Sequence, residues 1–141
     1  MSTEANLVLV RGIYKAFNDG DLDRAVSGVS PDFELTDMAM GQVFRGPEGF
    51  RNWLRPWLTA VPNAQTELTN VIAQDNWVFT EHTARGAHTG PFASPTGEIA
   101  PTGRHIDLRC AEVFQVKNDK VVSVRAYRDT ATLMRQLGLM Q

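Results

Sequence analysis

The chain has 141 residues, a size at which one domain can bury a hydrophobic core without disulfide bridges or structural metals. Hydrophobic residues make up 43% and charged residues 21%, as in ordinary globular proteins. The formal net charge of -2 gives no electrostatic reason to bind nucleic acid or an anionic membrane, so the charge balance favours a small or neutral ligand.

The single cysteine, Cys110, excludes an internal disulfide, and its usual role would be that of a small buried hydrophobic residue. The N-terminal segment lacks the basic and apolar regions of a signal peptide, and no stretch approaches the length of a membrane span. We therefore expect a cytoplasmic protein that folds as a single domain over residues 1–141.

The first half of the chain shows helical spacing of apolar residues. The first predicted helix carries them on one face: Leu7, Val10, Tyr14 and Phe17. Residues 18–20 are suited to end this helix, and Asp21 to cap a short second helix that ends before Pro31. A short strand is expected over residues 33–37.

A third helix is expected to begin at Gly46-Pro47, because proline fits the first helical position, and to continue to Pro62. Its apolar face comprises Phe50, Trp53, Leu54, Trp57 and Leu58. The two tryptophans give this face a large apolar surface.

From Thr66 onward the pattern is that of strands and turns. We expect strands through residue 73, over 77–90, over 105–116 and over 121–127, with a loop over 91–103. Asp129 or Thr130 can cap a closing helix that Gly138 ends. Helices followed by an antiparallel sheet indicate an α+β fold, with a curved sheet wrapped on the helices.

We assume that the strands on either side of the 91–103 loop pair directly, with Gly90 opposite Arg104. This assumption sets the partner of every residue in the two strands. The predicted pairs are His82 with Glu112, Ala84 with Cys110, and Thr80 with Phe114. In the next hairpin they are Phe114 with Val124, Val116 with Val122, and Glu112 with Ala126. The other face is predicted to be solvated or interfacial, and carries Thr83, Arg85, Asp107, Arg109 and Ala111.

This register places a single polar cluster, His82 and Glu112, on the apolar face. Directly opposed side chains have Cβ atoms about 5 Å apart, so a carboxylate base and an orienting imidazole could meet there. The alternative is a register slip of one residue, which would turn them to solvent. We predict no metal site, because His82 and His88 lie on one strand roughly 20 Å apart.

Several segments together carry a family resemblance. They are Ala16-Phe17-Asn18-Asp19-Gly20-Asp21-Leu22-Asp23, Phe44-Arg45-Gly46-Pro47-Glu48-Gly49-Phe50, Gly86-Ala87-His88-Thr89-Gly90, Pro101-Thr102-Gly103-Arg104, and Asp129 leading into Arg135-Gln136-Leu137-Gly138. In this order the chain resembles the SnoaL-like polyketide cyclases, or ester cyclases, of the nuclear transport factor 2-like superfamily. The resemblance implies a cone-shaped α+β barrel and a homodimer formed through the outer sheet face.

Members of this family close an aromatic polyketide ring by an intramolecular aldol reaction without a metal or cofactor. They use an acid/base aspartate on the last strand and a histidine on the strand before it, and these positions correspond here to Ala126 and Glu112. Because Ala126 cannot transfer a proton, the family's chemistry does not carry over unchanged. We expect Glu112 to act as the acid/base and His82 to orient it or polarise the substrate.

The expected substrate pocket is formed by Tyr14, Phe17, Phe50, Trp53, Trp57, Cys110, Phe114, Val124 and Ala126. The sequence therefore predicts a cofactor-independent acid/base enzyme acting on a hydrophobic, carbonyl-bearing small molecule. It does not choose between cyclisation, isomerisation, dehydration and hydrolysis. Two alternatives stay open, a non-catalytic ligand-binding module and a dimeric protein-interaction module of the same fold.

Overall fold

The computed structural model describes residues 2–94 and 97–140. The elements in chain order are α1 (Thr3–Asn18), α2 (Leu22–Val26), β1 (Val29–Asp37), β2 (Gln42–Arg45), α3 (Gly46–Ala60), β3 (Gln65–Gln74), β4 (Trp77–Ala87), β5 (Phe92–Ser94), β6 (Gly97–Ile99), β7 (His105–Lys117), β8 (Lys120–Arg128) and α4 (Thr130–Gln136). The predicted α+β class is confirmed.

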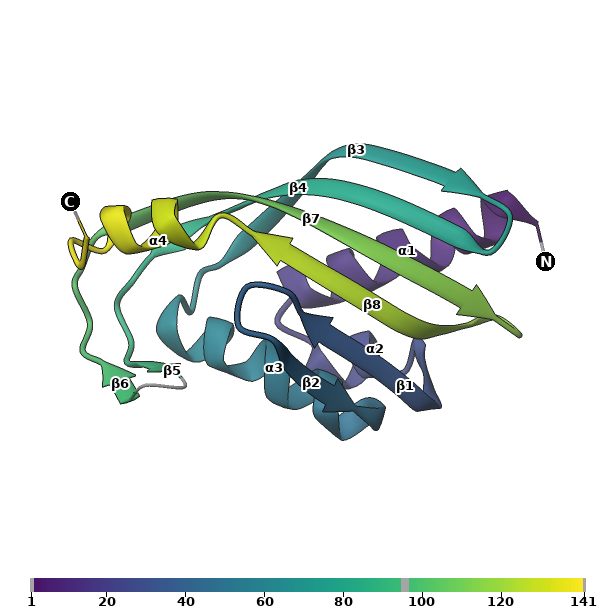
Figure 1. Ribbon diagram of the computed structural model, residues 1–141, viewed down its shortest axis with the longest axis horizontal. Coiled ribbons are helices and arrows are strands. Elements are labelled where there is room, and N and C mark those ends of the chain that lie inside the picture. Colours follow the sequence, from purple (N-terminus) through teal and green to yellow (C-terminus); the bar gives the residue numbers. More distant parts are fainter. Residues whose placement is uncertain (1, 95–96, 141) are drawn as a thin grey trace.

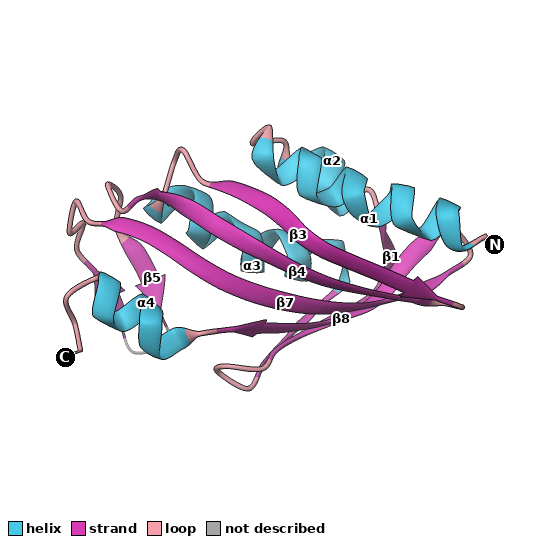
Figure 2. Ribbon diagram, turned by 90° about the horizontal axis from the view of Figure 1, so that it is seen from above, coloured by secondary structure: helices cyan, strands magenta, loops and turns pink. Residues whose placement is uncertain are grey.

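The main sheet has the strand order β2-β1-β8-β7-β4-β3, in which β1 and β8 run parallel and every other neighbouring pair is antiparallel. It curls strongly, and α1 and α3 lie against its inner face, with α2 packed on both of these helices (Figures 1 and 2). Strands β5 and β6 form a separate hairpin near the C-terminal end of α3. The curled sheet and the helices thus enclose an interior space.

Local sequence fixes the two helices that bound this interior. The Ser2 side chain accepts a hydrogen bond from the Ala5 backbone N–H and caps α1. Pro47 occupies the first turn of α3, as predicted. At the other end of α1 the Asn18 side chain bonds both the N–H and the C=O of Thr66, which docks the helix on β3.

The core consists of two clusters of buried side chains. The larger cluster lies between α1, α3 and the middle of the sheet and includes Val10, Phe33, Leu35, Leu54 and Val124. The smaller cluster joins the end of α3 to β7 and α4, and includes Ala60, Val61, Ile106, Leu108, Leu133 and Leu137. These clusters fix the two ends of the interior.

Three element predictions for the first half of the molecule and the long loop were wrong. The first strand begins at Val29, not at residue 33, and Pro31 is tolerated because the β1–β8 ladder is interrupted between Val29 and Glu34. Strand β2 was not predicted. The 91–103 segment is not all loop, since it contains the β5–β6 hairpin.

The predicted register of the hairpin around residues 91–103 is wrong by two residues. His82 lies opposite Cys110, and Thr80 opposite Glu112. The backbone pairing continues to His88, whose N–H bonds the Arg104 carbonyl, and the N–H groups of Thr89 and Gly90 then bond the Ala60 carbonyl of α3. Likewise Ala84 pairs with Leu108 and Phe114 with Val78. A shift of two preserves the face of each side chain, so the polar cluster keeps its inward position.

The β7–β8 register is confirmed at two of its three predicted pairs, Phe114 with Val124 and Glu112 with Ala126. Val116 pairs with Val121, not Val122, because a bulge follows Gln115. On the outer face, Arg85, Asp107 and Arg109 are exposed as predicted. Thr83 is buried, because this short side chain lies in register between the longer Glu67 and Arg109.

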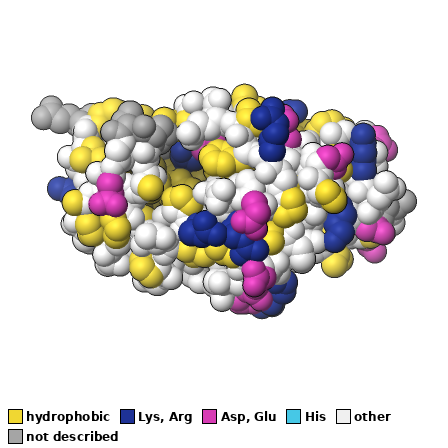
Figure 3. Space-filling model, turned by 90° about the horizontal axis from the view of Figure 1, so that it is seen from below, with side chains coloured by type: hydrophobic (Ala, Val, Ile, Leu, Met, Phe, Trp, Pro, Cys, Tyr) yellow, Lys and Arg dark blue, Asp and Glu magenta, His cyan; other side chains and the backbone are white. Residues whose placement is uncertain are grey.

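Charged side chains of both signs are scattered over the face shown in Figure 3, and neither sign forms a large continuous patch there. In the part of the chain that the structure describes, none of the helices combines the length and the apolar character needed to cross a membrane.

Candidate active site

A cavity lies between the inner face of the sheet and helices α1 and α3. Its volume is about 110 Å³. A single water needs roughly 10–15 Å³ by the same measure, so the cavity has room for a small organic molecule. Its wall includes all the predicted pocket residues, namely Tyr14, Phe17, Phe50, Trp53, Trp57, Cys110, Phe114, Val124 and Ala126, together with His82 and Glu112.

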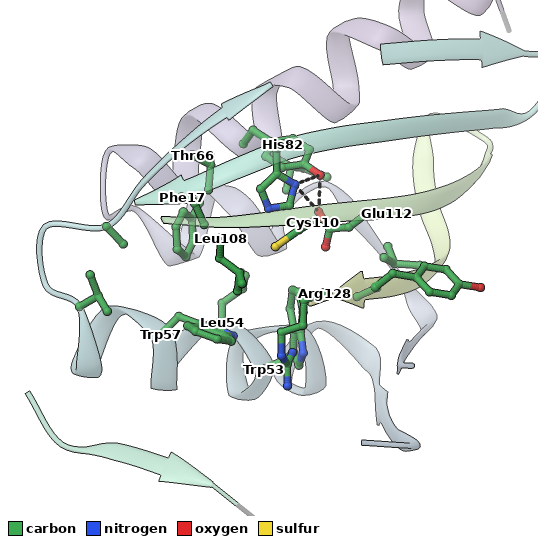
Figure 4. A pocket seen from close by; sticks show the side chains of 18 of the residues that line it. Phe17, Trp53, Leu54, Trp57, Thr66, His82, Leu108, Cys110, Glu112 and Arg128 are labelled. Carbon is green, nitrogen blue, oxygen red and sulfur yellow. Dashed lines mark hydrogen bonds and ion pairs between the residues drawn. The ribbon is translucent and has the colours of Figure 1, made fainter. Parts of the chain in front are cut away.

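Glu112 on β7 and His82 on β4 meet at the sheet side of this cavity (Figure 4). Both are buried, and His82 Nδ1 lies 3.7 Å from Glu112 Oε1, too far for a hydrogen bond. The Tyr14 hydroxyl joins them. It donates to Glu112 Oε1, lies 3.3 Å from His82 Nδ1, and lies 2.8 Å from Thr80 Oγ1.

Burial and the nearby charge of Glu112 raise the pKa of Tyr14 well above its usual value. Tyr14 therefore keeps its single proton and donates it to Glu112. Because that proton is used, His82 contacts the hydroxyl as a donor, which places a proton on its Nδ1. A neutral His82 then has its Nε2 free as an acceptor.

The remaining atoms of the pair are available to a ligand. Glu112 Oε2 makes no hydrogen bond to residues 2–94 or 97–140. Figure 4 shows this oxygen and the second ring nitrogen of His82 on the side that faces α3 across the cavity. One carboxylate oxygen and one imidazole nitrogen thus face the same apolar space, the arrangement needed for proton transfer.

Cys110 and Ala126 surround the carboxylate. Burial, and secondarily the charge of Glu112, raise the pKa of the Cys110 thiol from 9.0 to about 12. Cys110 is consequently a thiol at neutral pH and not a nucleophile. Ala126 lies directly opposite Glu112, and its single methyl group leaves open the space that a larger side chain would fill.

The α3 side of the cavity carries an ion pair that the sequence analysis did not predict. Arg128 Nη1 donates to Asp37 Oδ2 at 2.8 Å, and Asp37 also accepts the Trp53 Nε1 proton at 3.1 Å. The guanidinium lies over the Trp57 ring, 5.2 Å from its centroid. Figure 4 shows Arg128 reaching from the end of β8 toward the tryptophans.

Sequence reasoning placed Tyr14 in the pocket but missed its hydroxyl and missed Thr80, Asp37 and Arg128. A tyrosine within an otherwise apolar helix stripe is a usable signal, since its hydroxyl needs a partner when buried. Thr80 shares a face with His82, two residues away on one strand. Asp37 and Arg128 carry no such signal, because their contact depends on the parallel pairing of β1 with β8.

His88 is buried away from this cavity. Its Nδ1 accepts the Thr102 backbone N–H at 3.3 Å and lies 2.9 Å from the Thr102 hydroxyl, so its contacts hold the 88–102 connection together. Within residues 2–94 and 97–140, no three side chains of His, Cys, Asp and Glu gather as a metal-binding group would require.

Solved structures share this fold over nearly the whole chain. A SnoaL-like protein from Jannaschia sp. CCS1 has a TM-score of 0.86 at 19% identity, covering 99% of this chain and 95% of its own. AclR of Streptomyces galilaeus, a candidate hydroxylase, has a TM-score of 0.85 at 21% identity, with 99% and 89% covered. IdmH of Streptomyces antibioticus, a candidate polyketide cyclase, has a TM-score of 0.77 at 25% identity, with 94% and 98% covered. No curated protein matches the chain significantly.

The curled sheet, the helices and the cavity between them define an α+β cone, the fold that these solved structures share. Residues 8–137 match the family described as SnoaL-like polyketide cyclase. The chain belongs to that family, as its segments indicated.

Proposed function

We propose that this protein is an acid/base enzyme without a resident cofactor that acts on a hydrophobic, carbonyl-bearing small molecule. One observation carries the proposal: the buried carboxylate of Glu112 faces an apolar cavity, is held by the Tyr14 hydroxyl, and lies beside His82. Removing a proton from a carbon next to a carbonyl requires a base of this kind in a site that excludes water.

In the proposed reaction Glu112 Oε2 takes the proton from the substrate carbon. Tyr14 holds Oε1 and thereby fixes the direction of Oε2, while His82 Nε2 orients a hydroxyl or enol group of the substrate. Return of the proton to another carbon would complete an isomerisation, and its transfer to a β-hydroxyl group as the C–O bond breaks would release water and complete a dehydration. Attack of the carbanion on a second carbonyl, followed by transfer of the proton from Glu112 to the resulting alkoxide, would complete a cyclisation. Ala126 contributes space and no proton.

The test uses 2-tetralone, a bicyclic ketone with an acidic C–H group next to its carbonyl. Exchange of that hydrogen for deuterium in D₂O is followed by NMR with and without the protein. We expect wild-type protein to accelerate the exchange, and Glu112→Gln to lower the enzymatic rate by about a hundredfold or more, the usual contribution of a positioned base.

The matched control is Glu81→Gln, which removes a carboxylate from the exposed, outer face of the same sheet. It should leave exchange unchanged. Retention of the wild-type rate by Glu112→Gln would contradict the proposed role of Glu112. Tight binding of 2-tetralone with no exchange would favour a non-catalytic binding protein.

A further inference from the structure

Arg128 differs from the other arginines of the chain in being held rigidly at the wall of the cavity. Its side chain is only 14% exposed, its Nη1 is bound to Asp37, and its guanidinium is stacked on Trp57. Asp37 is itself fixed by Trp53 and by the backbone N–H groups of Ala39 and Met40. The guanidinium therefore cannot swing into solvent without breaking several contacts.

Two nitrogens of this guanidinium, Nε and Nη2, have no hydrogen-bond acceptor among the described residues. Arg128 Nε is buried and makes no hydrogen bond within residues 2–94 and 97–140. A buried donor without a partner is unfavourable, and a charged donor is more so. Nε is closed off by the surrounding atoms, whereas Nη2 is accessible. Because Arg128 lines the same cavity as Glu112, Nη2 is the donor that a ligand oxygen in that cavity would meet.

Strand register sets the spacing between this donor and the proposed base. Arg128 lies opposite Cys110, and Ala126 lies opposite Glu112, so Glu112 and Arg128 are diagonal neighbours on one face. Such neighbours are about 7–8 Å apart at their backbones, within reach of two long side chains. A single flat molecule in the cavity can contact both.

The charges indicate what kind of oxygen fits. Asp37 already balances Arg128, and Glu112 adds a further negative charge, so a neutral carbonyl group suits the resting site better than an anion. When Glu112 accepts a proton its charge disappears. The electron pair of the broken C–H bond forms a C=C bond, and the carbonyl π electrons move to the oxygen, which becomes a negatively charged enolate.

We propose that Arg128 holds the carbonyl oxygen of the substrate and stabilises the enolate that forms when Glu112 removes the neighbouring proton. The substrate class is thus a planar, apolar ketone or related carbonyl compound that can form an enolate. The proposal rests on the proposed function, because the negative charge on the substrate oxygen develops only when Glu112 removes a proton. Binding of an oxyanion by Arg128 can nevertheless be measured without turnover. Preorganised donors aimed at a developing charge make a large contribution to catalysis.

The probe is 4-nitrophenol, a planar oxyanion when ionised, whose neutral and ionised forms absorb at different wavelengths and coexist near neutral pH. Binding is measured in Glu112→Gln, which reproduces the uncharged state of Glu112 after proton transfer. We expect this variant to bind the phenolate form preferentially. Adding Arg128→Gln should weaken phenolate binding by about tenfold or more, the usual effect of losing a charge-assisted hydrogen bond.

Nitrobenzene, which lacks the phenolate oxygen, reports whether the cavity itself is intact. Its affinity should change little when Arg128→Gln is added to Glu112→Gln. Arg125→Gln is the matched control, because Arg125 is exposed on the outer face of the same strand and stacks on Trp77 away from the cavity. It should keep the phenolate preference. Arg128→Lys retains a charge for Asp37 but lacks the second donor group, Nη2, and we expect it to lose most of the preference.

An unchanged phenolate preference in Arg128→Gln would overturn the proposal, and so would an equal loss of nitrobenzene affinity. If Arg128→Gln does not fold, Arg128→Lys decides by the same two criteria. These outcomes are separate from the test of Glu112, because they concern binding and not exchange. A Glu112→Gln variant that still exchanges deuterium would contradict the proposed role of Glu112 as the base. The phenolate-binding measurement would still decide whether Arg128 binds an oxyanion.

Discussion

Tyr14 is the residue that links the helical layer to the proposed chemistry. Its hydroxyl is the donor to Glu112 Oε1, and its ring packs edge-on against His82 and Phe114. Two roles are therefore combined in one side chain, filling the core and orienting the carboxylate. These roles separate when the hydroxyl alone is removed.

Tyr14→Phe removes the hydroxyl and keeps the ring. We expect kcat for deuterium exchange to fall by about tenfold, since a carboxylate that is no longer held spends less time in the reactive orientation. KM for 2-tetralone should change little, because the apolar wall is retained. Thr80→Val is the comparison, as it removes a hydroxyl that touches Tyr14 but has no contact with the Glu112 carboxylate. A rise in KM without loss of kcat would contradict the positioning role.

Cys110 gives the protein a predictable response to alkaline pH. The folded-state pKa of its thiol is about 12, whereas an unfolded cysteine titrates near 8.5. Folding therefore favours the protonated thiol, and this contribution to stability is fully present below about pH 8.5 and is lost as the pH rises toward 12. Tyr14, whose pKa is also raised, acts in the same direction at higher pH.

We predict that the free energy of unfolding falls as the pH rises from about 8 to about 10.5. The fall should be shallower in Cys110→Ala, because that variant has no thiol to ionise when unfolded. Urea unfolding of both proteins across this range measures the difference. Parallel curves for the two proteins would show that Cys110 does not have the raised pKa.

At the scale of elements, the junction between β4 and α3 sets the register of the site. A Cβ atom on Gly90 would lie 1.9 Å from the Thr59 carbonyl oxygen, so only glycine lets the strand end reach the helix. Gly12 provides the contrast, since it is an exposed residue in α1 with no atom near the position of a Cβ. The same substitution should have opposite effects at these two sites.

We expect Gly90→Ala to destabilise the protein by about 1–3 kcal/mol, the usual range for overpacking. Gly12→Ala should stabilise it by about 0.5–1 kcal/mol through better helix propensity. Denaturant midpoints with matched slopes measure both changes. A neutral Gly90→Ala variant would mean that the close approach of β4 to α3 is not required.

The same junction explains which parts of the site could be read from the sequence. Alternation of apolar residues along the strands identified the faces correctly, so His82 and Glu112 were expected to point inward although their pairing was two residues out. The register depends on hydrogen bonds from Thr89 and Gly90 to a helix that is distant in sequence, and no local pattern encodes them. The Asp37–Arg128 pair was missed because the two residues are 91 positions apart.

On the scale of the whole molecule, the two faces of the sheet differ in the surfaces that they form. The inner face and the helices enclose the cavity, and every polar group of the proposed site comes from this one chain. The outer face carries exposed apolar residues on neighbouring strands. Ile72 lies directly opposite Phe79, Phe79 lies opposite Val113, and Tyr127 is exposed on β8.

Such a cluster on an otherwise polar surface is typical of a protein interface. We expect it to be the contact surface of a homodimer, as the family resemblance implies, with the same patch used by both copies. Phe79 and Ile72 are 47% and 57% exposed in the single chain, so burial of both would supply much of the apolar contact.

Phe79→Glu introduces a charge at the centre of this patch and should convert the dimer to a monomer, because each copy would bury an unpaired carboxylate in the interface. Val8→Glu is the matched control, since Val8 is 70% exposed on α1, on the helical side of the sheet. Sedimentation velocity at micromolar concentration should show a dimer for the wild type and for Val8→Glu, and a monomer for Phe79→Glu.

The monomer should still accelerate deuterium exchange, because the cavity is complete within one chain. A wild-type monomer at this concentration would contradict the dimer, and a dimeric Phe79→Glu would place the interface elsewhere.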